Sequence, residues 1–377
     1  MIRVRMVALG ALAVLALLVS ACGLPGTIPQ RGRIPTAAPA PTATPLPPPL
    51  FPQDEAPHHN LTEWWYYTGH FAGKDTSGHQ HQYGFELVFF QNLRGQVPPY
   101  YAAHFAISDL TRGEFHYDQQ AALTTANTIP PAGSTRGFDV ALGAWEIKGL
   151  GGHDALAATQ DGYQMSLSLS DTLPHPVLHG GSGIITYGQA GYSYYYSRPR
   201  MSVSGSIVDH GATVPVSGLA WMDHQWGDFV SLAGAGWDWF SIQLSDGTSA
   251  MLYVIRDAQK KPLSTVGTFI AADGTVSDIP AEGIQLSATG SWTSPHTQGV
   301  YPSGWKISLP GMQTSLTETP ALLDQELDTA RSTGVAYWEG AVHVSGTAHG
   351  KAVTGQGYTE LTGYATVRPA IGTPAAG

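Results

Sequence analysis

The sequence predicts an all-β protein with two tandem antiparallel β-barrel domains, preceded by a lipoprotein signal and a proline-rich linker. Three observations lead to this prediction. Apolar and polar residues alternate along short segments, turn residues separate these segments, and two segments of the first half recur in the second. We expect the barrels at 53–227 and 228–367, followed by a tail at 368–377.

Residues 1–21 have the features of a bacterial lipoprotein signal peptide. Arg3 and Arg5 form a basic start, and an apolar stretch too short to span a bilayer comfortably leads to the sequence VSAC. Cys22 ends this motif and is the only cysteine of the chain. We expect lipidation of Cys22 and attachment to the outer face of a bacterial membrane, with no disulfides in the exported domains. The alternative is an ordinary secretory signal with an incidental cysteine.

The segment 22–52 follows as a linker, with ten prolines between residues 23 and 52. Such a composition cannot bury a core and favours an extended spacer of about 3.1 Å per residue. The whole chain carries 18 basic and 28 acidic residues. This acidic balance argues against nucleic acid as a partner, because phosphate backbones are bound by basic surfaces.

Strand periodicity dominates the rest of the chain. The segments YQMSLSLS (163–170), FSIQLS (240–245) and WKISL (305–309) each alternate apolar with polar residues, which is typical of half-buried antiparallel strands. The dipeptides Asp246-Gly247 and Asp273-Gly274 are turn signals between such segments.

One helix is expected at TPALLDQELDTA, residues 319–330. Thr319 would be its N-cap, and Pro320 its first helical residue.

Two internal matches indicate a duplication, with the halves meeting near residues 227–236. WYYTGHFAG from Trp65 aligns with WFSIQLSDG from Trp239, and each is followed by a hydrophobic strand. Further on, VSGLAWMD (216–223) aligns with VTGQGYTE (353–360). The matches occur in the same order, as expected of a repeated barrel.

The repeat separates shared residues from unique ones in WMDHQWG (221–227). Its second copy keeps an aromatic and a carboxylate, at Tyr358 and Glu360, but has Leu361 at the position of His224. We interpret the shared residues as structural, so His224 and Trp226 become the better functional candidates.

Eight aromatic-rich motifs occur in order from about His58 to Tyr364, and together they resemble the AttH and carotenoid 1,2-hydratase (CrtC) family. The motifs are EWWYYTGHF (63–71), YGFELVFF (83–90), AHFAISD (103–109), HGGSG (179–183), YYYSRPRMSVSG (194–205), WMDHQWG (221–227), GWDWFSIQL (236–244) and GYTELTGY (357–364). The resemblance implies two lipocalin-like barrels. It also implies either hydration of an acyclic carotenoid end group or an exported role linked to an ABC transporter.

Hydration of an isolated double bond needs a protonated acid, aromatic faces for the carbocation and a polar group that handles water. The resemblance maps the hydratases' catalytic His and Trp onto His224 and Trp226. Their Tyr and Asp would lie on the next strand, but SAMLYVIR (249–256) has no carboxylate. Asp238 and Asp223 are therefore the remaining candidates for the acid.

We expect a ligand chamber where the two barrels meet, with the His224 imidazole facing it. The expected ligand-contacting residues are Trp221, Trp237, Trp239, Tyr253, Trp65 and Tyr67. Structural roles are the alternative for each candidate. The aspartates could accept backbone N–H groups, His224 could be a buried histidine bonded to Asp223 or a tyrosine, and the tryptophans could fill the barrel core. Glu63 is interpreted as a residue that makes a local structural hydrogen bond.

Other chemistries fit the sequence less well. The fifteen histidines include no HExxH pattern, so we expect no metal, and no cofactor motif is present. HGGSG (179–183) is similar to an oxyanion-loop sequence of serine hydrolases. The chain has no GxSxG nucleophile elbow, which argues against a serine hydrolase.

Two functions follow from these observations. The first is an exported, lipid-anchored protein that binds a long apolar ligand such as an isoprenoid or lipid, with an ABC transporter as partner. The alternative is a hydro-lyase that resembles carotenoid 1,2-hydratase.

Overall fold

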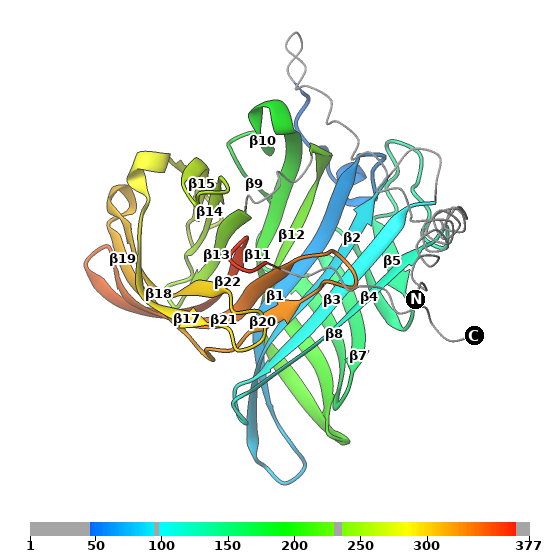
Figure 1. Ribbon diagram of the computed structural model, residues 1–377, viewed down its shortest axis with the longest axis horizontal. Coiled ribbons are helices and arrows are strands. Elements are labelled where there is room, and N and C mark those ends of the chain that lie inside the picture. Colours follow the sequence, from blue (N-terminus) through cyan, green and yellow to red (C-terminus); the bar gives the residue numbers. More distant parts are fainter. Residues whose placement is uncertain (1–45, 94–97, 230–235, 367–377) are drawn as a thin grey trace, which may run out of the picture. The chain divides into compact units, whose positions relative to one another are not determined.

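The computed structural model describes residues 46–93, 98–229 and 236–366. Nearly all regular structure in this part of the chain is β-strand, arranged in two antiparallel sheets (Figure 1). Each sheet curls into a barrel-like form, which confirms the predicted all-β class with two barrels. The predicted signal peptide and Cys22 lie outside the described residues. Within them, no helix has the length and apolarity required to cross a bilayer.

The N-terminal sheet has the strand order β4-β3-β2-β1-β12-β11-β8-β7-β6-β5, and β9 and β10 pair with β11. Its strands are β1 (Thr62–Lys74), β2 (Gln80–Asn92), β3 (Tyr100–Asp109), β4 (Glu114–Leu123), β5 (Phe138–Leu142), β6 (Trp145–Leu150), β7 (His153–Gln160), β8 (Tyr163–Asp171), β9 (Val177–Leu178), β10 (Ile184–Thr186), β11 (Gly191–Asp209) and β12 (Ala212–Phe229).

The C-terminal sheet has the order β16-β15-β14-β13-β22-β21-β19-β18-β17, and β20 pairs with β21. Its strands are β13 (Gly236–Leu244), β14 (Ser249–Arg256), β15 (Pro262–Ile270), β16 (Val276–Ile279), β17 (Gln285–Thr293), β18 (Val300–Leu309), β19 (Thr314–Pro320), β20 (Glu326–Asp328), β21 (Ala336–Ala348) and β22 (Lys351–Thr362). Four short 3₁₀ turns complete the described elements: η1 (Gln53–Glu55), η2 (Gly188–Ala190), η3 (Ala281–Gly283) and η4 (Pro310–Met312).

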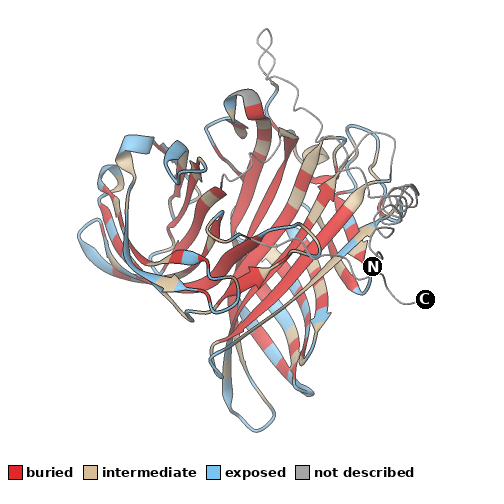
Figure 2. Cartoon of the chain, in the orientation of Figure 1, coloured by how far each residue is buried: buried red, intermediate tan, exposed pale blue. Residues whose placement is uncertain are grey.

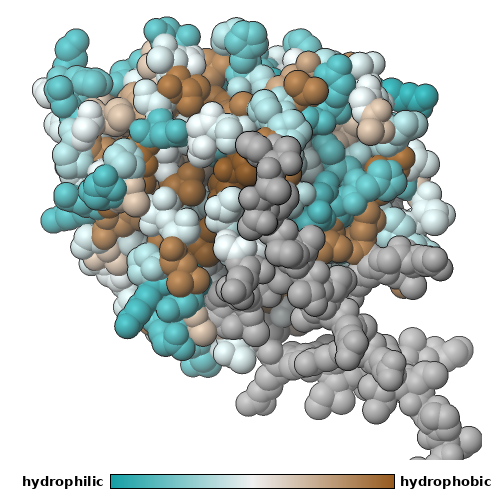
Figure 3. All heavy atoms as spheres, turned by 90° about the horizontal axis from the view of Figure 1, so that it is seen from above, coloured by the Kyte–Doolittle hydropathy of each residue, from teal (hydrophilic) through white to brown (hydrophobic). Residues whose placement is uncertain are grey.

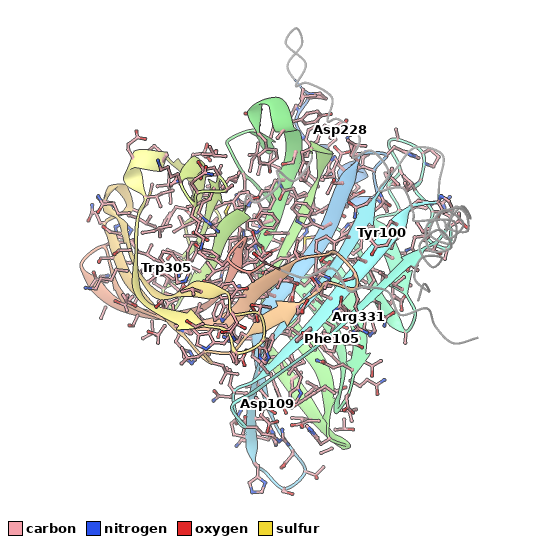
Figure 4. The ribbon with its side chains drawn as sticks, in the orientation of Figure 1. Tyr100, Phe105, Asp109, Asp228, Trp305 and Arg331 are labelled. Atoms are coloured by element: carbon pink, nitrogen blue, oxygen red, sulfur yellow. The ribbon has the colours of Figure 1, made fainter. Side chains whose placement is uncertain are left out.

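Each sheet encloses its own apolar core. In β8 every second residue from Tyr163 to Leu169 is buried, as the alternation predicts. Phe105 lies in the core of the N-terminal sheet, and Trp305 lies inside the C-terminal sheet (Figure 4). Burial of each large apolar side chain stabilises the fold by about 1.5–3 kcal/mol.

The helix expected at 319–330 is absent, and that prediction is wrong. β19 continues to Pro320, and residues 326–328 form the short strand β20 against β21. The Gln325 side chain accepts a hydrogen bond from the backbone N–H of Ala341 at 2.9 Å. Pairing with a neighbouring strand outweighs the local helix propensity of this segment.

The two sheets share the arrangement of their central strands, because β1 lies between β2 and β12 as β13 lies between β14 and β22. Tyr66 is opposite Asp223 across β1 and β12, and Trp239 is opposite Glu360 across β13 and β22. With Asp223 matched to Glu360, Trp239 therefore corresponds to Tyr66. The sequence match of Trp239 with Trp65 is wrong by one residue, and a one-residue shift moves a side chain to the other face of the strand.

The central strands are buried on both faces, because the outer faces of the two sheets pack against each other (Figure 2). Tyr66 and Trp239 meet in this contact edge to face, with ring centroids 5.2 Å apart. Ser241 and Gln243 of β13 are polar, and they are buried in this contact. The apolar residues that alternate with them are also buried. This second buried layer contains the candidate functional site.

Candidate functional site between the two sheets

A cleft of about 60 Å³ lies between the outer faces of the two sheets and is partly open to solvent. The N-terminal sheet contributes Trp64, Tyr66, Glu86, Val88, Phe90, Tyr195, Asp223 and Gln225. The C-terminal sheet contributes Trp237, Trp239, Tyr253, Tyr337 and Glu360. In the view from above, apolar residues are visible between hydrophilic ones at the surface (Figure 3). The cleft thus combines aromatic walls with several carboxyl groups.

Asp223 of β12 is buried and held by three donors. Trp221 Nε1 donates to its Oδ1 at 2.6 Å, Tyr195 donates its hydroxyl to Oδ2 at 2.5 Å, and Ser197 donates to Oδ1. Burial nevertheless raises the pKa of Asp223 to about 7, because desolvation outweighs these bonds. The donors fix the orientation of the carboxylate in the cleft wall.

The bonds around Asp223 extend to both sheets. Trp239 Nε1 donates to the Tyr195 hydroxyl at 2.9 Å. His179 Nε2 lies 2.6 Å from Ser197 Oγ, and its Nδ1 lies 2.8 Å from Thr268 Oγ1. Desolvation lowers the pKa of His179 to about 3, so this imidazole stays neutral. These contacts make Asp223 part of the inter-sheet packing.

Glu360 of β22 occupies the matching position in the second sheet and is less enclosed. Its Oε2 accepts a hydrogen bond from Trp237 Nε1 at 2.7 Å. Desolvation raises the pKa of Glu360 to about 7, and the negative charge of Asp223 adds to the rise. Its side chain remains partly exposed in the cleft, so a bound molecule can approach it.

Two further carboxyls, Glu86 of β2 and Glu339 of β21, are fully buried. Tyr337 donates its hydroxyl to Glu86 Oε1 at 2.8 Å, and Tyr66 donates to Glu339 Oε1 at 2.7 Å. The other oxygen of each carboxyl has no partner. Burial raises the pKa of Glu86 to about 8 and raises that of Glu339 well above its usual range, with the charge of Glu86 as a further cause.

Among the described residues, those that line the cleft include no lysine or arginine. In the described part of the chain, no ion pair involves Asp223, Glu360, Glu86 or Glu339. Without a cationic partner, a desolvated carboxyl keeps its proton near neutral pH. The cleft can therefore present carboxylic acids to an apolar molecule that lies against aromatic rings.

His224 lies on the opposite face of β12, away from the cleft. It is fully buried inside the N-terminal barrel, 2.7 Å from Glu63 Oε1 through Nε2 and 3.2 Å from the Tyr196 hydroxyl through Nδ1. The expectation that its imidazole faces the inter-barrel chamber is wrong, because alternation along β12 places Asp223 and Gln225 on the cleft side. Its bond to a tyrosine agrees with the structural alternative, whereas Asp223 is not its partner.

Three other predicted site residues share this interior face. Trp226, Trp65 and Tyr67 belong to the core of the N-terminal barrel and do not line the cleft. Trp65 stacks on His224 with ring centroids 4.9 Å apart. Tyr67 donates its hydroxyl to Asp154 at 2.9 Å.

Asp238 faces away from the cleft as well. It pairs with Arg256 at 2.9 Å and accepts a hydrogen bond from the Tyr364 hydroxyl at 3.0 Å. Burial raises its pKa, and the Arg256 charge opposes that rise. Asp238 is thus an ion-paired carboxylate and not a free acid in the cleft.

The remaining predicted ligand-contacting residues lie at the cleft. Trp237, Trp239 and Tyr253 line it, and Trp221 lies behind it as a donor to Asp223. Glu86 is not predictable from the sequence, because it is one alternating position in a hydrophobic strand, and the repeat predicts only a structural role for Glu360. The repeat contains a signal for Glu360. Its carboxyl matches that of Asp223, and two similar sheets that face one cleft place matching residues in that cleft.

Two curled sheets with a cleft between them define the class as a two-domain lipocalin-like protein. The chain belongs to the AttH-like family, whose model matches residues 42–364. It is 32% identical to an AttH-type protein of Nitrosomonas europaea, with a TM-score of 0.74 over 87% of this chain and 99% of that crystal structure.

Kievitone hydratase is a second relative. The chain is 25% identical to the Fusarium solani subsp. phaseoli enzyme over 197 residues, which span 51% of this chain and 55% of that protein. The chain thus matches about half the length of that enzyme. The crystal structure of kievitone hydratase from Nectria haematococca shares the fold, with a TM-score of 0.66 at 20% identity over 88% of this chain and 97% of that one.

Proposed function

We propose that this protein is a hydro-lyase that adds water to an isolated carbon–carbon double bond of an apolar, isoprenoid-type molecule bound in the cleft. The observation that carries this proposal is Glu360, a carboxyl without a cationic partner in an aromatic cleft, with a pKa raised to about 7. A carboxylic acid that is still protonated near neutral pH is what protonation of an alkene carbon requires.

The two matched carboxyls have separate roles in this proposal. Glu360 accepts a hydrogen bond from Trp237 and is partly exposed, so it acts as the proton donor to carbon. The pKa of Asp223 is also raised to about 7, so part of it is ionised at neutral pH. Its three donors stabilise that ionised form, and in this proposal it accepts the proton of the attacking water. The alkene gains one proton and one hydroxide in total, and solvent exchange returns each carboxyl to its starting state.

The aromatic walls support the intermediate of such a reaction. Protonation of a trisubstituted alkene leaves a tertiary carbocation, and aromatic faces attract cations. Trp237, Trp239 and Tyr253 lie along the same cleft as Glu360. The similarity to kievitone hydratase is consistent with this chemistry, although that match covers only part of each chain.

The direct test is turnover by the purified full-length chain. Isoprenoid compounds with a terminal trisubstituted double bond would be incubated in water enriched in ¹⁸O, and the hydrated product detected by mass spectrometry. A labelled tertiary alcohol that disappears in Glu360→Gln supports the proposal. Tight binding without any labelled product from the panel would favour the second candidate.

The second candidate is a binding protein that holds a long apolar ligand and exchanges it with an ABC transporter. The aromatic cleft between the sheets favours it, because apolar ligands bind in concave, largely apolar sites. Native mass spectrometry of the chain isolated from its source would detect a retained ligand. Loss of that ligand in Trp239→Ala, but not in the matched core variant Trp305→Phe, would assign it to the cleft.

We further propose export and lipid attachment through Cys22, which place the cleft outside a bacterial membrane. The VSAC motif and the single cysteine support this proposal. Metabolic labelling with a fatty acid should mark the wild-type chain and leave Cys22→Ser unlabelled. Labelling of the serine variant to the same extent would contradict lipidation at this residue.

A further inference from the structure

A second group of chemically capable side chains lies inside the N-terminal barrel, separate from the cleft. Glu63 Oε1 lies 2.8 Å from His58 Nδ1 and 2.7 Å from His224 Nε2. One potential ligand atom from each side chain lies within 4.8 Å of the others. We propose that His58, Glu63 and His224 bind a divalent transition-metal ion such as Zn²⁺.

The strand pairing explains why these residues meet. Glu63 of β1 is opposite Trp226, and His224 of β12 is opposite Trp65, so Glu63 and His224 are diagonal neighbours on one face. His58 approaches from the segment between η1 and β1. The group lies at the end of the sheet marked by Asp228, whose carboxylate accepts the backbone N–H of Leu61 (Figure 4).

Both histidines are held through the ring nitrogen that faces away from Glu63 Oε1. His58 Nε2 lies 3.5 Å from Asp54 Oδ1, and His224 Nδ1 lies 3.2 Å from the Tyr196 hydroxyl. In metal sites, the ring nitrogen that does not bind the metal is usually held in this way by a carboxylate or another oxygen. These outer contacts orient His58 Nδ1 and His224 Nε2 toward a common centre.

Glu63 is oriented by its second oxygen. Its Oε2 accepts the backbone N–H of His58 at 2.8 Å and the side-chain amide of Gln91 at 2.9 Å. Gln91 is directly opposite Glu63 on β2. Because Oε2 accepts these two hydrogen bonds, Oε1 is the oxygen that can bind a metal ion between the two imidazoles.

Two imidazoles and one glutamate form the protein ligand set of a class of zinc sites that leave a fourth position for water. A tetrahedral ion with bonds of about 2.0–2.1 Å requires ligand atoms about 3.3 Å apart. Glu63 Oε1 would therefore withdraw from each imidazole by roughly half an ångström. His58 is partly exposed and gives access to the centre, whereas Glu63 and His224 are fully buried.

Aromatic packing limits the movement of both rings. His58 stacks on Trp226 with ring centroids 4.1 Å apart and an interplanar angle of 1°. Trp65 stacks on His224 at 4.9 Å. These contacts hold the imidazole planes. The two imidazole nitrogens lie within 4.8 Å of each other and would approach to about 3.3 Å around a tetrahedral ion.

The test is metal binding by the purified full-length chain in detergent, stripped with a chelator and titrated with Zn²⁺ or Co²⁺. We expect one tightly bound ion per chain, a rise in Tm with Zn²⁺, and visible Co²⁺ absorption bands typical of four-coordinate geometry. His224→Ala and Glu63→Gln should each weaken binding by at least ~100-fold. His296→Ala is the matched control, because His296 bonds a carboxylate, Asp324, at an exposed place outside the group.

Two gentler variants keep the experiment decisive if a ligand variant does not fold. Asp54→Asn and Tyr196→Phe leave all three ligands in place and should weaken binding by ~10–100-fold, because they remove only outer contacts. A wild-type chain that takes up no stoichiometric Zn²⁺, or a His224→Ala chain that binds it equally well, would overturn the proposal. Glu360→Gln should bind Zn²⁺ like the wild type, so this result is independent of cleft chemistry.

Discussion

Asp223 and Glu360 occupy equivalent positions in the two sheets and line the same cleft from its two sides. Each is a carboxyl on the strand that pairs with the first strand of its sheet, and neither has a cationic partner among the described residues. Their surroundings differ in the number of hydrogen-bond donors, which separates their expected roles as base and acid.

Replacement of the acid should affect chemistry more than binding. Glu360→Gln keeps the size of the side chain but cannot supply the proton, so we expect kcat for hydration to fall by at least ~100-fold with KM within a few-fold of wild type. Steady-state kinetics would measure both constants. Glu282→Gln, at an exposed position in η3, is the control and should leave both unchanged. Equal turnover by Glu360→Gln and wild type would exclude Glu360 as the donor.

Hydration should decline as pH rises through about 7. Burial raises the pKa of Glu360 to about 7, so its acid form predominates below that pH and decreases about tenfold per unit above it. The negative charge of Asp223 also raises this pKa, whereas the buried Glu86 and Glu339 have raised pKa values of their own. A profile of kcat against pH would show this alkaline decline, together with an acid decline below about pH 7, where the proposed base Asp223 becomes protonated. A kcat independent of pH between 6 and 9 would contradict this assignment.

The C-terminal barrel should lose stability as pH rises. Burial raises the pKa of Glu318 to about 8; one of its oxygens accepts a bond from Thr359 and the other has no partner. Since the folded-state pKa is higher than that of the unfolded chain, the contribution is fully present below about pH 4.5 and is lost as pH rises through 8. At pH 8.5, Glu318→Gln should therefore increase the free energy of unfolding by on the order of 2 kcal/mol.

Urea unfolding of wild type and Glu318→Gln at pH 5 and pH 8.5 would measure this effect. The difference between the variants should be small at pH 5 and large at pH 8.5. A difference that is the same at both pH values would show that Glu318 does not titrate as described.

The buried Asp238–Arg256 pair should be important for stability and not for hydration. Asp238→Ala leaves the Arg256 guanidinium buried without its partner, which should lower the free energy of unfolding by about 3–5 kcal/mol. The double variant Asp238→Ala, Arg256→Met should recover much of that loss. Denaturant unfolding measures these energies, and turnover by the folded protein should persist. A selective loss of kcat in a stable Asp238→Asn variant would instead support a catalytic role for Asp238.

Trp239 should contribute to both the inter-sheet contact and the cleft wall. Trp239→Ala removes the ring that packs on Tyr66 and should cost about 3–5 kcal/mol of unfolding free energy. Trp239→Phe keeps an aromatic ring and removes the hydrogen bond to Tyr195, with an expected cost of about 1 kcal/mol. Equal costs for the two variants would show that the hydrogen bond, and not the packing, carries the contribution of Trp239.

Much of the fold could be predicted because it rests on local patterns. The alternation in YQMSLSLS (163–170) and WKISL (305–309) identified strands that the structure contains, and the turn signals and the repeat identified two barrels. The helix at 319–330 was wrongly predicted, because its local signals did not include the pairing of residues 326–328 with β21. The candidate site was predicted in part, through Asp223, Trp237, Trp239 and Tyr253.

The sequence by itself determined the all-β class, the order of the two barrels and the aromatic composition of the site, because strand periodicity is a property of neighbouring residues. Only the tertiary structure decided which face of each central strand meets the cleft. Both faces of β12 are buried, so burial alone does not distinguish Asp223 from His224. The packing of one sheet on the other placed Asp223 and Glu360 in the cleft and His224 beside Glu63 and His58 inside the barrel, because adjacent residues of a strand point to opposite faces.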